Sequence, residues 1–487
     1  MNKKIAWLLA ALLAASSMTA CGSAETAGET TAVGTDNTVE AAEETAETEL
    51  SDNLPEADYD GYTFRITTWY DEVGLEESTG EVLNDAIFKR DLAVEERFNI
   101  DITAVMAANE NYSECTEAIR QSVIAGSNDW DAGFLHMVSA SNAAPEGIFY
   151  SLNTLPHVDL TKPWWDHDCL EAFTIGGNIK IASTITLVNS ALRASCLAFN
   201  YKTFDDNGIA YPYDMVTEGT WTLDAAYDIV KDATRDLNGD GAIKPEDDFF
   251  GMTSWYLNSP YTLYYGGGGT LISYNADGYP EIDLNLEKNV ALFDKIYDII
   301  VTSQSNFCTI YDKYYDLAYD LFCENRAHLV TLSLSGLRED RFRNMETDYG
   351  VVPSPKFDES QSEYYSFVNG AAAMLAVPSV LENPERTGVI LEAMGSETYR
   401  SVWDVLYEVT VKAKYMRDEQ ATGMINLIIE NRGFDFGYAH MYDNGTMQFM
   451  RDLLVNQSKN VASTLEKGEK AMNAQLTKVV AAYQENQ

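Results

Sequence analysis

The feature that most constrains the fold is an alternation of strand-like and helix-like segments in the first part of the chain. Thr63 to Trp69 carries β-branched and aromatic residues, Glu81 to Phe98 repeats apolar positions at helical spacing, and residues 100–106 alternate at period two. A helical pattern at 114–125 and a short apolar strand at 132–137 continue the series. Strands that alternate with helices usually pair in parallel and are covered on both faces. We therefore expect an α/β fold with a mainly parallel sheet.

A second series of the same kind follows. A strand-like segment at Leu197–Tyr201 precedes helical patterns at 222–234 and 286–301, and two more strand-like pieces lie at 327–332 and 349–353. The C-terminal part is mostly helical by the spacing of its apolar residues. The length of 487 residues allows two or three domains. We expect two lobes, each with a mainly parallel sheet flanked by helices.

The charge balance excludes some classes of partner. The chain holds 76 acidic and 33 basic side chains, for a formal net charge of −43. Nucleic acids and anionic membranes need clustered lysine and arginine, so neither is expected as a direct partner. The sequence contains no GxSxG, HExxH, CxxC or GxxxxGK[ST] motif, and its five histidines show no metal-ligand spacing. No catalytic motif of these kinds therefore indicates an enzyme.

The N-terminus has the layout of a secretory signal. Lys3 and Lys4 precede an almost unbroken apolar run from Ile5 to Ala15, which is too short for a stable membrane span. The next residues, Met18-Thr19-Ala20-Cys21, resemble the bacterial lipobox, in which the cysteine is lipidated and becomes the new N-terminus. The alternative is an ordinary signal peptide that is cleaved nearby, with Cys21 incidental.

An acidic segment follows the signal. Residues 22–53 hold nine Asp or Glu and no Lys, Arg or aromatic residue. Such a segment buries too little apolar surface to fold, and its like charges keep it extended. We expect residues 1–20 to be a signal peptide and residues 21–54 to be a lipidated cysteine with a disordered acidic tether. Beyond the tether no stretch reaches the roughly 18 apolar residues of a membrane helix.

Five cysteines remain after Cys21, an odd number in an exported chain, so they cannot all pair internally. Their wide spacing is typical of small buried residues and not of a disulfide framework. One pair, Cys308 with Cys323, stays open.

Residues 236–247 have the spacing of a calcium-binding loop. The oxygen ligands of such a loop stand at positions one, three, five, seven and twelve: Asp236, Asn238, Asp240, Ala242 through its carbonyl, and Asp247. Calcium takes six to eight oxygens, and Gly241 at position six permits the sharp turn. Aspartate at position twelve resembles dockerin-type loops. We expect a structural Ca²⁺; the alternative is an acidic turn without metal.

Aromatic residues are the clearest sign of a ligand. Trp69 and Tyr70 follow a strand of the first sheet, and ligands of such sheets bind beyond the carboxyl ends of the strands. Trp255, Tyr264 and Trp403 also stand near glycines, prolines and acids. Trp and Tyr faces stack on the apolar faces of sugar rings. For any one of these residues core packing is the alternative; as a set they favour a polyol or oligosaccharide cleft.

Several segments together resemble the extracellular solute-binding lipoproteins of carbohydrate-type ABC importers, which include the maltose-binding proteins. Leu197–Lys202 is similar to the family's crossing strand, and Trp221–Leu223 with Asp236–Gly251 resembles its "W-T … DLNGDG … D-x-x-G" stretch. Phe322–Leu332 is similar to its "F-x-x-G-x-A" segment but lacks the glycine. Tyr349–Pro355 with Phe367–Gly370 resembles the return into the first lobe. The order of these motifs, over most of residues 60–485, carries the resemblance.

The resemblance implies a type II two-lobed periplasmic-binding-protein fold. Lobe 1 would hold residues 55–196 and about 340–400, and lobe 2 would hold residues 197–339 and about 401–487. The lobes would close at a hinge on a carbohydrate, and the closed form would dock on an ABC permease.

The resemblance also implies residue roles and a location. Trp69, Trp255 and Trp403 would stack on the ligand, with Asn369 and Arg338 at its hydroxyls. The chain would be a monomer, held by its lipid on the outer face of a bacterial cell membrane, in a Gram-positive organism. A surface-anchored glycan hydrolase or a polysaccharide-binding scaffold remains the alternative.

Overall fold

The computed structural model describes residues 50–107, 111–255, 259–309, 315–412, 419–441 and 448–486. The chain divides into two units, Met1–Ser51 and Asp52–Gln487, and the elements below belong to the second. The predicted signal peptide and Cys21 lie outside the described residues. Within the described ranges, no helix combines the length and the apolar composition that a membrane span requires.

The first sheet has four strands in the order β14-β3-β1-β2. Their bounds are β1 Tyr62–Thr68, β2 Ile100–Met106, β3 Ala132–His136 and β14 Ala373–Ala376. β1 pairs in parallel with β2 and β3, whereas β14 runs antiparallel to β3. The helices of this part are α3 (Val82–Phe98), α4 (Glu114–Ala125), α15 (Pro384–Ser401) and α16 (Trp403–Lys412). The strand–helix alternation read from the sequence is confirmed.

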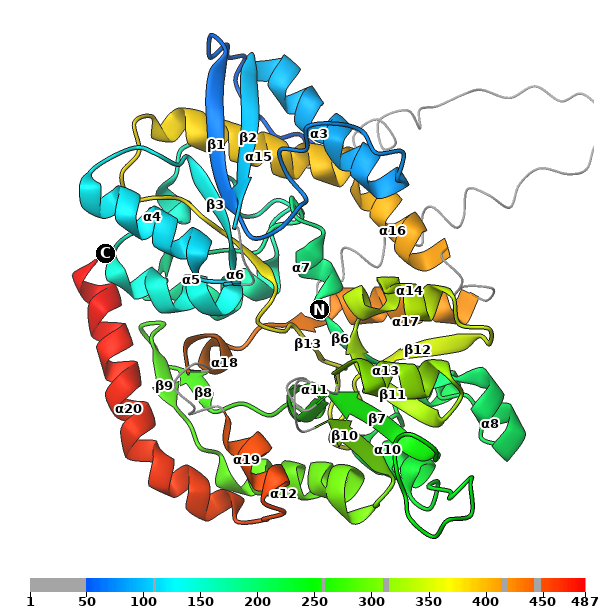
Figure 1. Cartoon of the computed structure of the whole chain (residues 1–487). Coiled ribbons are helices and arrows are strands. Elements are labelled where there is room, and N and C mark those ends of the chain that lie inside the picture. The colour runs from blue at the N-terminus through cyan, green and yellow to red at the C-terminus, as the bar shows by residue number, and fades with distance from the viewer. Residues whose placement is uncertain are drawn as a thin grey trace, which may run out of the picture. The chain divides into compact units, whose positions relative to one another are not determined.

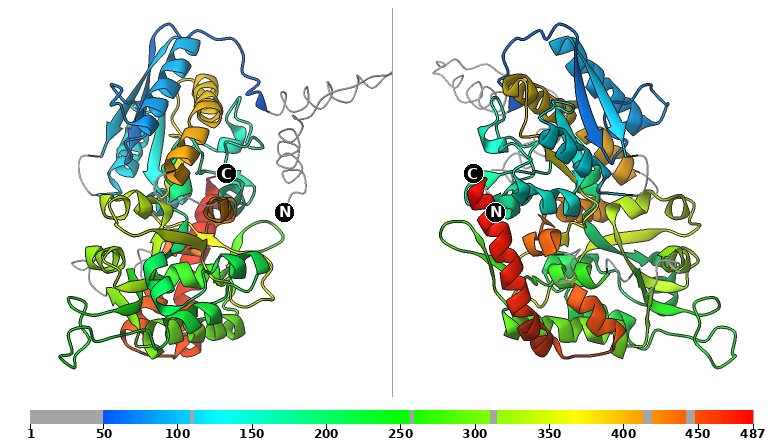
Figure 2. Two further views of the ribbon diagram at one scale, coloured as in Figure 1. Left: turned by 90° about the vertical axis from the view of Figure 1, so that its right-hand side faces the viewer. Right: turned by 60° about the vertical axis from the view of Figure 1, so that its left-hand side comes forward.

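The second sheet has five strands in the order β10-β7-β11-β6-β12. Their bounds are β6 Ser195–Asn200, β7 Phe250–Trp255, β10 Asn306–Thr309, β11 Ala327–Ser333 and β12 Tyr349–Pro353. β7 is parallel to β10 and β11, and β6 is antiparallel to β11 and β12. Helices α10 (Leu223–Val230), α13 (Tyr315–Cys323) and α17 (Glu419–Glu430) pack on it, and α12 (Leu286–Tyr297) packs on α10. Figures 1 and 2 show the two sheets as separate layers, each with its own helices.

Where the chain passes from one sheet to the other, the strand that it enters is antiparallel to its neighbours. β6 follows the elements of the first sheet, and β14 follows those of the second. This exchange makes two lobes from one chain and confirms the expected fold class.

The lobe boundaries differ from those expected. β12 belongs to the second sheet and β14 to the first, so the chain returns between residues 353 and 373 and not at about 340. Helix α16 packs on α3 and α15, so the part that belongs to lobe 1 extends past residue 400.

The folded body also begins earlier than expected. Asp52 is buried, and its Oδ2 accepts a hydrogen bond from Arg97 Nη1 at 2.6 Å. A charge-assisted bond of this kind fixes residue 52 to α3, so the tether predicted for residues 21–54 ends before it.

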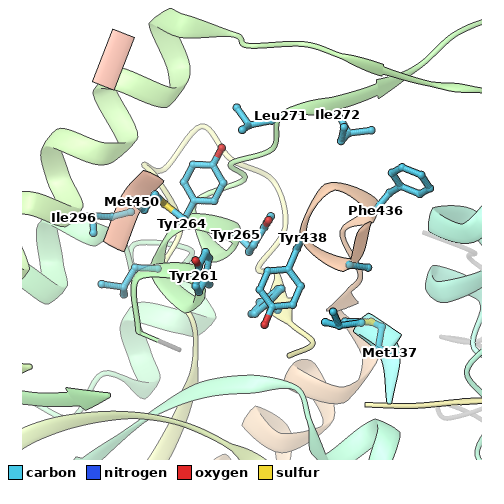
Figure 3. Packing of buried hydrophobic residues seen from close by; sticks show 14 of the residues in the cluster. Met137, Tyr261, Tyr264, Tyr265, Leu271, Ile272, Ile296, Phe436, Tyr438 and Met450 are labelled. Carbon is cyan, nitrogen blue, oxygen red and sulfur yellow. The ribbon is translucent and has the colours of Figure 1, made fainter. Parts of the chain in front are cut away.

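The largest apolar cluster joins elements of both lobes. Helix α5 (Met137–Ala143) of the first lobe packs on α18 (Phe436–Met441). Tyr438 of α18 contacts Tyr261 of α11 (Ser259–Gly266). Figure 3 shows Met137, Phe436, Tyr438 and Tyr261 within this cluster. Helix α20 (Val461–Glu485), red in Figure 1, contacts η1 (Ala144–Glu146) at one end and α12 near the other.

The remaining elements are short. Their bounds are η2 Leu152–Thr154, α6 His167–Phe173, β4 Thr174–Ile175, β5 Asn178–Ile179, α7 Asn189–Leu192, α8 Tyr201–Asn207, α9 Tyr213–Glu218, β8 Ile272–Tyr274, β9 Pro280–Ile282, η3 Asp298–Thr302, η5 Leu334–Arg338, α14 Asp340–Arg343, β13 Ser366–Phe367, β15 Arg432–Gly433 and α19 Phe449–Val455.

Candidate functional site

The candidate site lies where the carboxyl ends of the parallel strands meet the segments that cross between the lobes. In the first sheet these ends carry Trp69 after β1 and His136 at the end of β3. Because Ala373 pairs with His136, the turn before β14 lies at the same edge. In the second sheet Ser195 pairs with Ser333, which places Arg193 beside the start of η5. Ligands of α/β sheets bind at such edges.

Three aromatic rings form one wall of the site. The rings of Trp69 and His136 lie edge to face, with centroids 5.1 Å apart, and the ring of Tyr112 lies 4.4 Å from His136 at 32°. All three side chains are half-buried. Burial, aided by the charge of Arg193, lowers the pKa of His136 to about 3, so this imidazole is neutral at physiological pH. Neutral ring faces of this kind can stack on the apolar face of a sugar.

The crossing segments pair with one another where the two lobes join, and we call this region the hinge. Ala194 and Val368 make an antiparallel bridge, and the N–H of Asn369 donates to the carbonyl of Arg193 at 3.3 Å. A third segment joins them through β15, because Phe367 pairs in parallel with Gly433. Where so few residues connect two lobes, small dihedral changes can turn one lobe against the other.

Charged and polar groups lie next to the hinge. Glu72 Oε2 accepts a hydrogen bond from the N–H of Asn189 at 2.9 Å. Arg193 Nε donates to the side-chain oxygen of that same asparagine at 3.3 Å, and Arg193 Nη1 donates to Ser335 Oγ at 3.5 Å. Burial raises the pKa of Glu72 to about 6, although the Asn189 bond and the charges of Arg338 and Arg193 lower it. A carboxylate can accept hydrogen bonds from hydroxyl groups, and a guanidinium group can donate hydrogen bonds to them.

Arg90 holds the loop that carries Trp69 and Glu72. Its guanidinium is fully buried and donates to the carbonyls of Glu72 and Thr186 at 2.9 and 2.7 Å. It also pairs with Asp91, whose Oδ2 accepts from the N–H of Gly74 at 2.8 Å. These hydrogen bonds therefore hold the loop in position without a ligand.

The structure buries two of the expected ligand residues in the core. Tyr70 is 5% exposed, and its hydroxyl donates to the carbonyl of Ala371 at 2.8 Å. Tyr264 is 1% exposed on α11, where its hydroxyl donates to Asn289 Oδ1 at 2.6 Å. Figure 3 shows Tyr264 beside Tyr265 within the apolar cluster. Both predictions are wrong for this conformation, because neither ring has a free face.

The other expected residues occupy different places. Trp69 lies in the aromatic wall, Arg338 is exposed at the end of η5, and Trp255 is half-buried at the end of β7. Asn369 is at the hinge, but its Oδ1 accepts from the N–H of Ala371 and so shapes the turn. Trp403 packs against the apolar clusters around α3 and α15. Ligand contact by Trp255, Arg338, Asn369 and Trp403 stays a prediction.

Four residues of the site were missed from the sequence: Glu72, Tyr112, His136 and Arg193. A signal was present for two of them. His136 ends a parallel strand, and Arg193 stands two residues before the crossing strand β6; strand topology assigns such positions to ligand edges. Glu72 and Tyr112 stand in loops whose course depends on tertiary contacts.

The expected calcium loop lies between α10 and β7. Asp236 accepts from the N–H groups of Gly239 and Gly241, both at 2.7 Å, and Lys244 Nζ lies 2.6 Å from Asp240 Oδ2. Buried Asp248 accepts from the N–H groups of Leu237 and Lys244, both at 2.8 Å, and closes the loop.

The donor set of this loop consists of hard oxygens, as calcium requires. In the described part of the chain, however, no three acidic, histidine or cysteine side chains converge as they would around a metal. Asn238, Ala242 and Asp247 are exposed there. Calcium therefore stays a prediction.

Of the described cysteines, Cys115, Cys169 and Cys196 are buried and Cys323 is half-buried. Cys115, Cys169, Cys196 and Cys323 are free, so the Cys308–Cys323 pair is not formed; the side chain of Cys308 lies outside the described residues.

Comparison with known proteins places the fold. No family model and no curated protein sequence matches this chain. Among solved structures, it resembles the ABC substrate-binding protein Lmo0181 from Listeria monocytogenes in complex with cycloalternan (12% identity, 86% of this chain and 100% of that chain, TM-score 0.56). It also resembles the cyclic α-maltosyl-1,6-maltose binding protein from Arthrobacter globiformis (12%, 85% and 99%, 0.57). A third is UgpB from Mycobacterium tuberculosis in complex with glycerophosphocholine (13%, 86% and 98%, 0.54). With a two-lobed body and three crossing segments already evident, this chain has the fold of the substrate-binding proteins of ABC importers.

Proposed function

We propose that this chain is the substrate-binding protein of an ABC importer, which captures a carbohydrate between its lobes and delivers it to a permease. The observation that carries the proposal is the position of Trp69, Tyr112 and His136 close to the Ala194–Val368 crossing: a Cβ on Gly370, two residues after Val368, would lie 3.5 Å from Cε1 of His136. A ligand stacked on these rings would touch the hinge itself, so binding and lobe closure would be coupled.

The composition of the site favours a carbohydrate. Aromatic faces suit the apolar faces of sugar rings, while Glu72 and Arg193 can accept from and donate to hydroxyls. Two of the similar structures are described with cyclic oligosaccharides and one with glycerophosphocholine, so this fold serves more than one polar ligand. The aromatic wall is our reason for choosing an oligosaccharide.

Capture requires no chemical step. The open protein would bind the sugar on one lobe, and rotation at the hinge would bring the second lobe onto it. The free energy of the new contacts would shift the population toward the closed form, and the permease would bind this form. We propose no catalytic residue.

The N-terminus would keep the protein near its permease. A lipid on Cys21 and the acidic segment up to about residue 51 would tether the body to the outer face of the membrane, as a monomer.

A thermal-shift screen of the mature protein against oligosaccharides tests the proposal. We expect at least one to raise the melting temperature. Trp69→Ala should abolish this shift, whereas Trp130→Ala should retain it, because Trp130 precedes the opposite end of β3 and lies outside the site. A screen in which no oligosaccharide stabilises the protein would contradict the proposed ligand class.

A further inference from the structure

Two arginines at the site lack the acidic partner that arginine has almost everywhere else in this acid-rich chain. Each described arginine other than Arg193, Arg235 and Arg338 has a carboxylate within 4.0 Å. The guanidinium of Arg235 stacks on the ring of Phe249, 4.2 Å from its centroid. Arg193 and Arg338 thus have no ion-pair partner within 4.0 Å in the described part of a chain with 76 acidic residues.

Both arginines are associated with the same short helix, η5. Arg193 Nη1 reaches Ser335 Oγ at 3.5 Å, and Ser335 stands three residues before Arg338 in the 3-10 helix η5. Side chains three residues apart eclipse one another in a 3-10 helix, because it has three residues per turn. The side chain of Arg338 therefore starts on the face that Arg193 approaches.

One carboxylate lies close to both arginines. Glu72, in the loop after β1, feels the charges of both arginines. Its Oε2 is occupied by the N–H of Asn189, and no bond of 4.0 Å or less joins it to either guanidinium among the described contacts. Its other charged neighbour is Asp71. The site thus carries two guanidinium groups without an ion-pair partner among the described residues and the carboxylates of Glu72 and Asp71, next to the aromatic wall.

We infer that the ligand is an anionic sugar whose charged group binds between Arg193 and Arg338 while its ring stacks on Trp69. This inference rests on the proposed function and names the ligand class of the same site. Guanidinium groups bind carboxylates and phosphates in a planar, bidentate manner, and such bonds are about twice as strong as neutral ones. A uronic acid and a sugar phosphate share this chemistry, and the experiment separates them.

The experiment compares acidic oligosaccharides with neutral counterparts. Calorimetric titrations of the mature protein use oligogalacturonate and its methyl ester, a glucuronate-bearing xylo-oligosaccharide and its carboxyl-reduced form, neutral maltodextrins, and maltose 1-phosphate. We expect an acidic oligosaccharide to bind roughly tenfold or more tightly than its neutral counterpart. Tighter binding of the phosphate than of every uronate assigns the charge to phosphate and also supports an anionic ligand.

Variants then test the two arginines. Arg193→Gln and Arg338→Gln should each lower the affinity for the acidic ligand by roughly tenfold to a hundredfold. Arg338 is exposed, so its variant should fold, and Arg338→Lys should keep part of the affinity because the charge remains. Arg235→Gln is the matched control and should change nothing. Glu72→Gln should strengthen binding of the acidic ligand, because it removes a like charge.

The outcomes separate this inference from the proposed function. Neutral oligosaccharides that bind as well as acidic ones, with affinities unaffected by both arginine variants, would overturn the anionic ligand and leave the sugar-binding function standing. If none of these sugars binds, the result contradicts both the anionic ligand and the sugar-binding function.

Discussion

Arg432 joins two parts of the chain that meet at the hinge. Its Nε and Nη2 donate to Oδ2 of Asp166 at 3.0 and 2.6 Å, and its Nη1 donates to the carbonyl of Ile429 at 2.8 Å. Asp166 also caps α6 through Oδ1, which accepts from the N–H of Cys169. The pair therefore connects the end of α17, which packs on the second sheet, to the start of α6. Both side chains are largely buried.

Removing one partner of this pair should be costly. Arg432→Met leaves the Asp166 carboxylate buried without its charge partner, so we expect the free energy of unfolding to fall by about 3–5 kcal/mol. Adding Asp166→Asn should restore part of the loss, because the uncompensated charge disappears. Urea denaturation measures both. A single variant as stable as the parent would show that the pair contributes little to the fold.

The buried carboxyl of Glu392 should make stability depend on pH. It is 0% exposed, accepts from Trp165 Nε1 at 3.1 Å, and has its pKa raised from 4.5 to about 8 by burial. Between these values the folded state holds a proton that the unfolded state releases, so this group's contribution is complete below pH 4.5 and is lost as pH rises to about 8.

Glu392→Gln keeps the neutral shape and removes this titration. We expect the variant and the parent to unfold alike near pH 5 and the variant to be more stable at pH 9, by on the order of 3 kcal/mol. Melting curves across this range check the sign. A difference that stays constant with pH would mean that Glu392 does not titrate on unfolding in this window.

Replacing two glycines in helices by alanine should have opposite effects on stability. A Cβ on Gly388 of α15 would lie 1.8 Å from the carbonyl oxygen of Pro156, whereas a Cβ on Gly423 of α17 would meet nothing within 4 Å. We expect Gly388→Ala to destabilise by about 1–3 kcal/mol through overpacking. Gly423→Ala should stabilise by about 0.5–1 kcal/mol, because alanine is the better helix former. Urea midpoints compare them, and equal effects of the two variants would contradict the packing around α15.

Calcium remains testable at the 236–247 loop. If the loop binds Ca²⁺, a hundredfold excess of calcium over Kd should stabilise the mature protein by about 2.7 kcal/mol, and a chelator should reverse the shift. Asp236→Asn should weaken the response, whereas Asp228→Asn, on α10 outside the loop, should not. A melting temperature that is insensitive to both calcium and chelator excludes the ion.

The sequence predicted the fold better than it predicted the site. A helical pattern placed α4, and a short strand-like segment placed β12, at the residues where they lie, because the local sequence carries both signals. Tyr264 misled because its aromatic, glycine-rich surroundings are a close-packed turn: a Cβ on Gly269 would lie 2.5 Å from the Tyr264 ring. Whether an aromatic ring faces solvent or a core depends on contacts distant in sequence, as between Tyr264 and Asn289. Periodicity carries no information on those contacts.

Closure of the lobes on a sugar is the central claim, and single-molecule energy transfer tests it most directly. Dyes would be attached at Ile124→Cys on α4, which is 77% exposed, and at Asp206→Cys on α8, in a mature chain without Cys21 and with Cys323→Ser. We expect a stabilising oligosaccharide to change the distance between the dyes in one step to a closed-state value, with the sugar recovered unchanged. Binding with no change in distance, or sugar consumed during the measurement, would contradict capture by hinge closure.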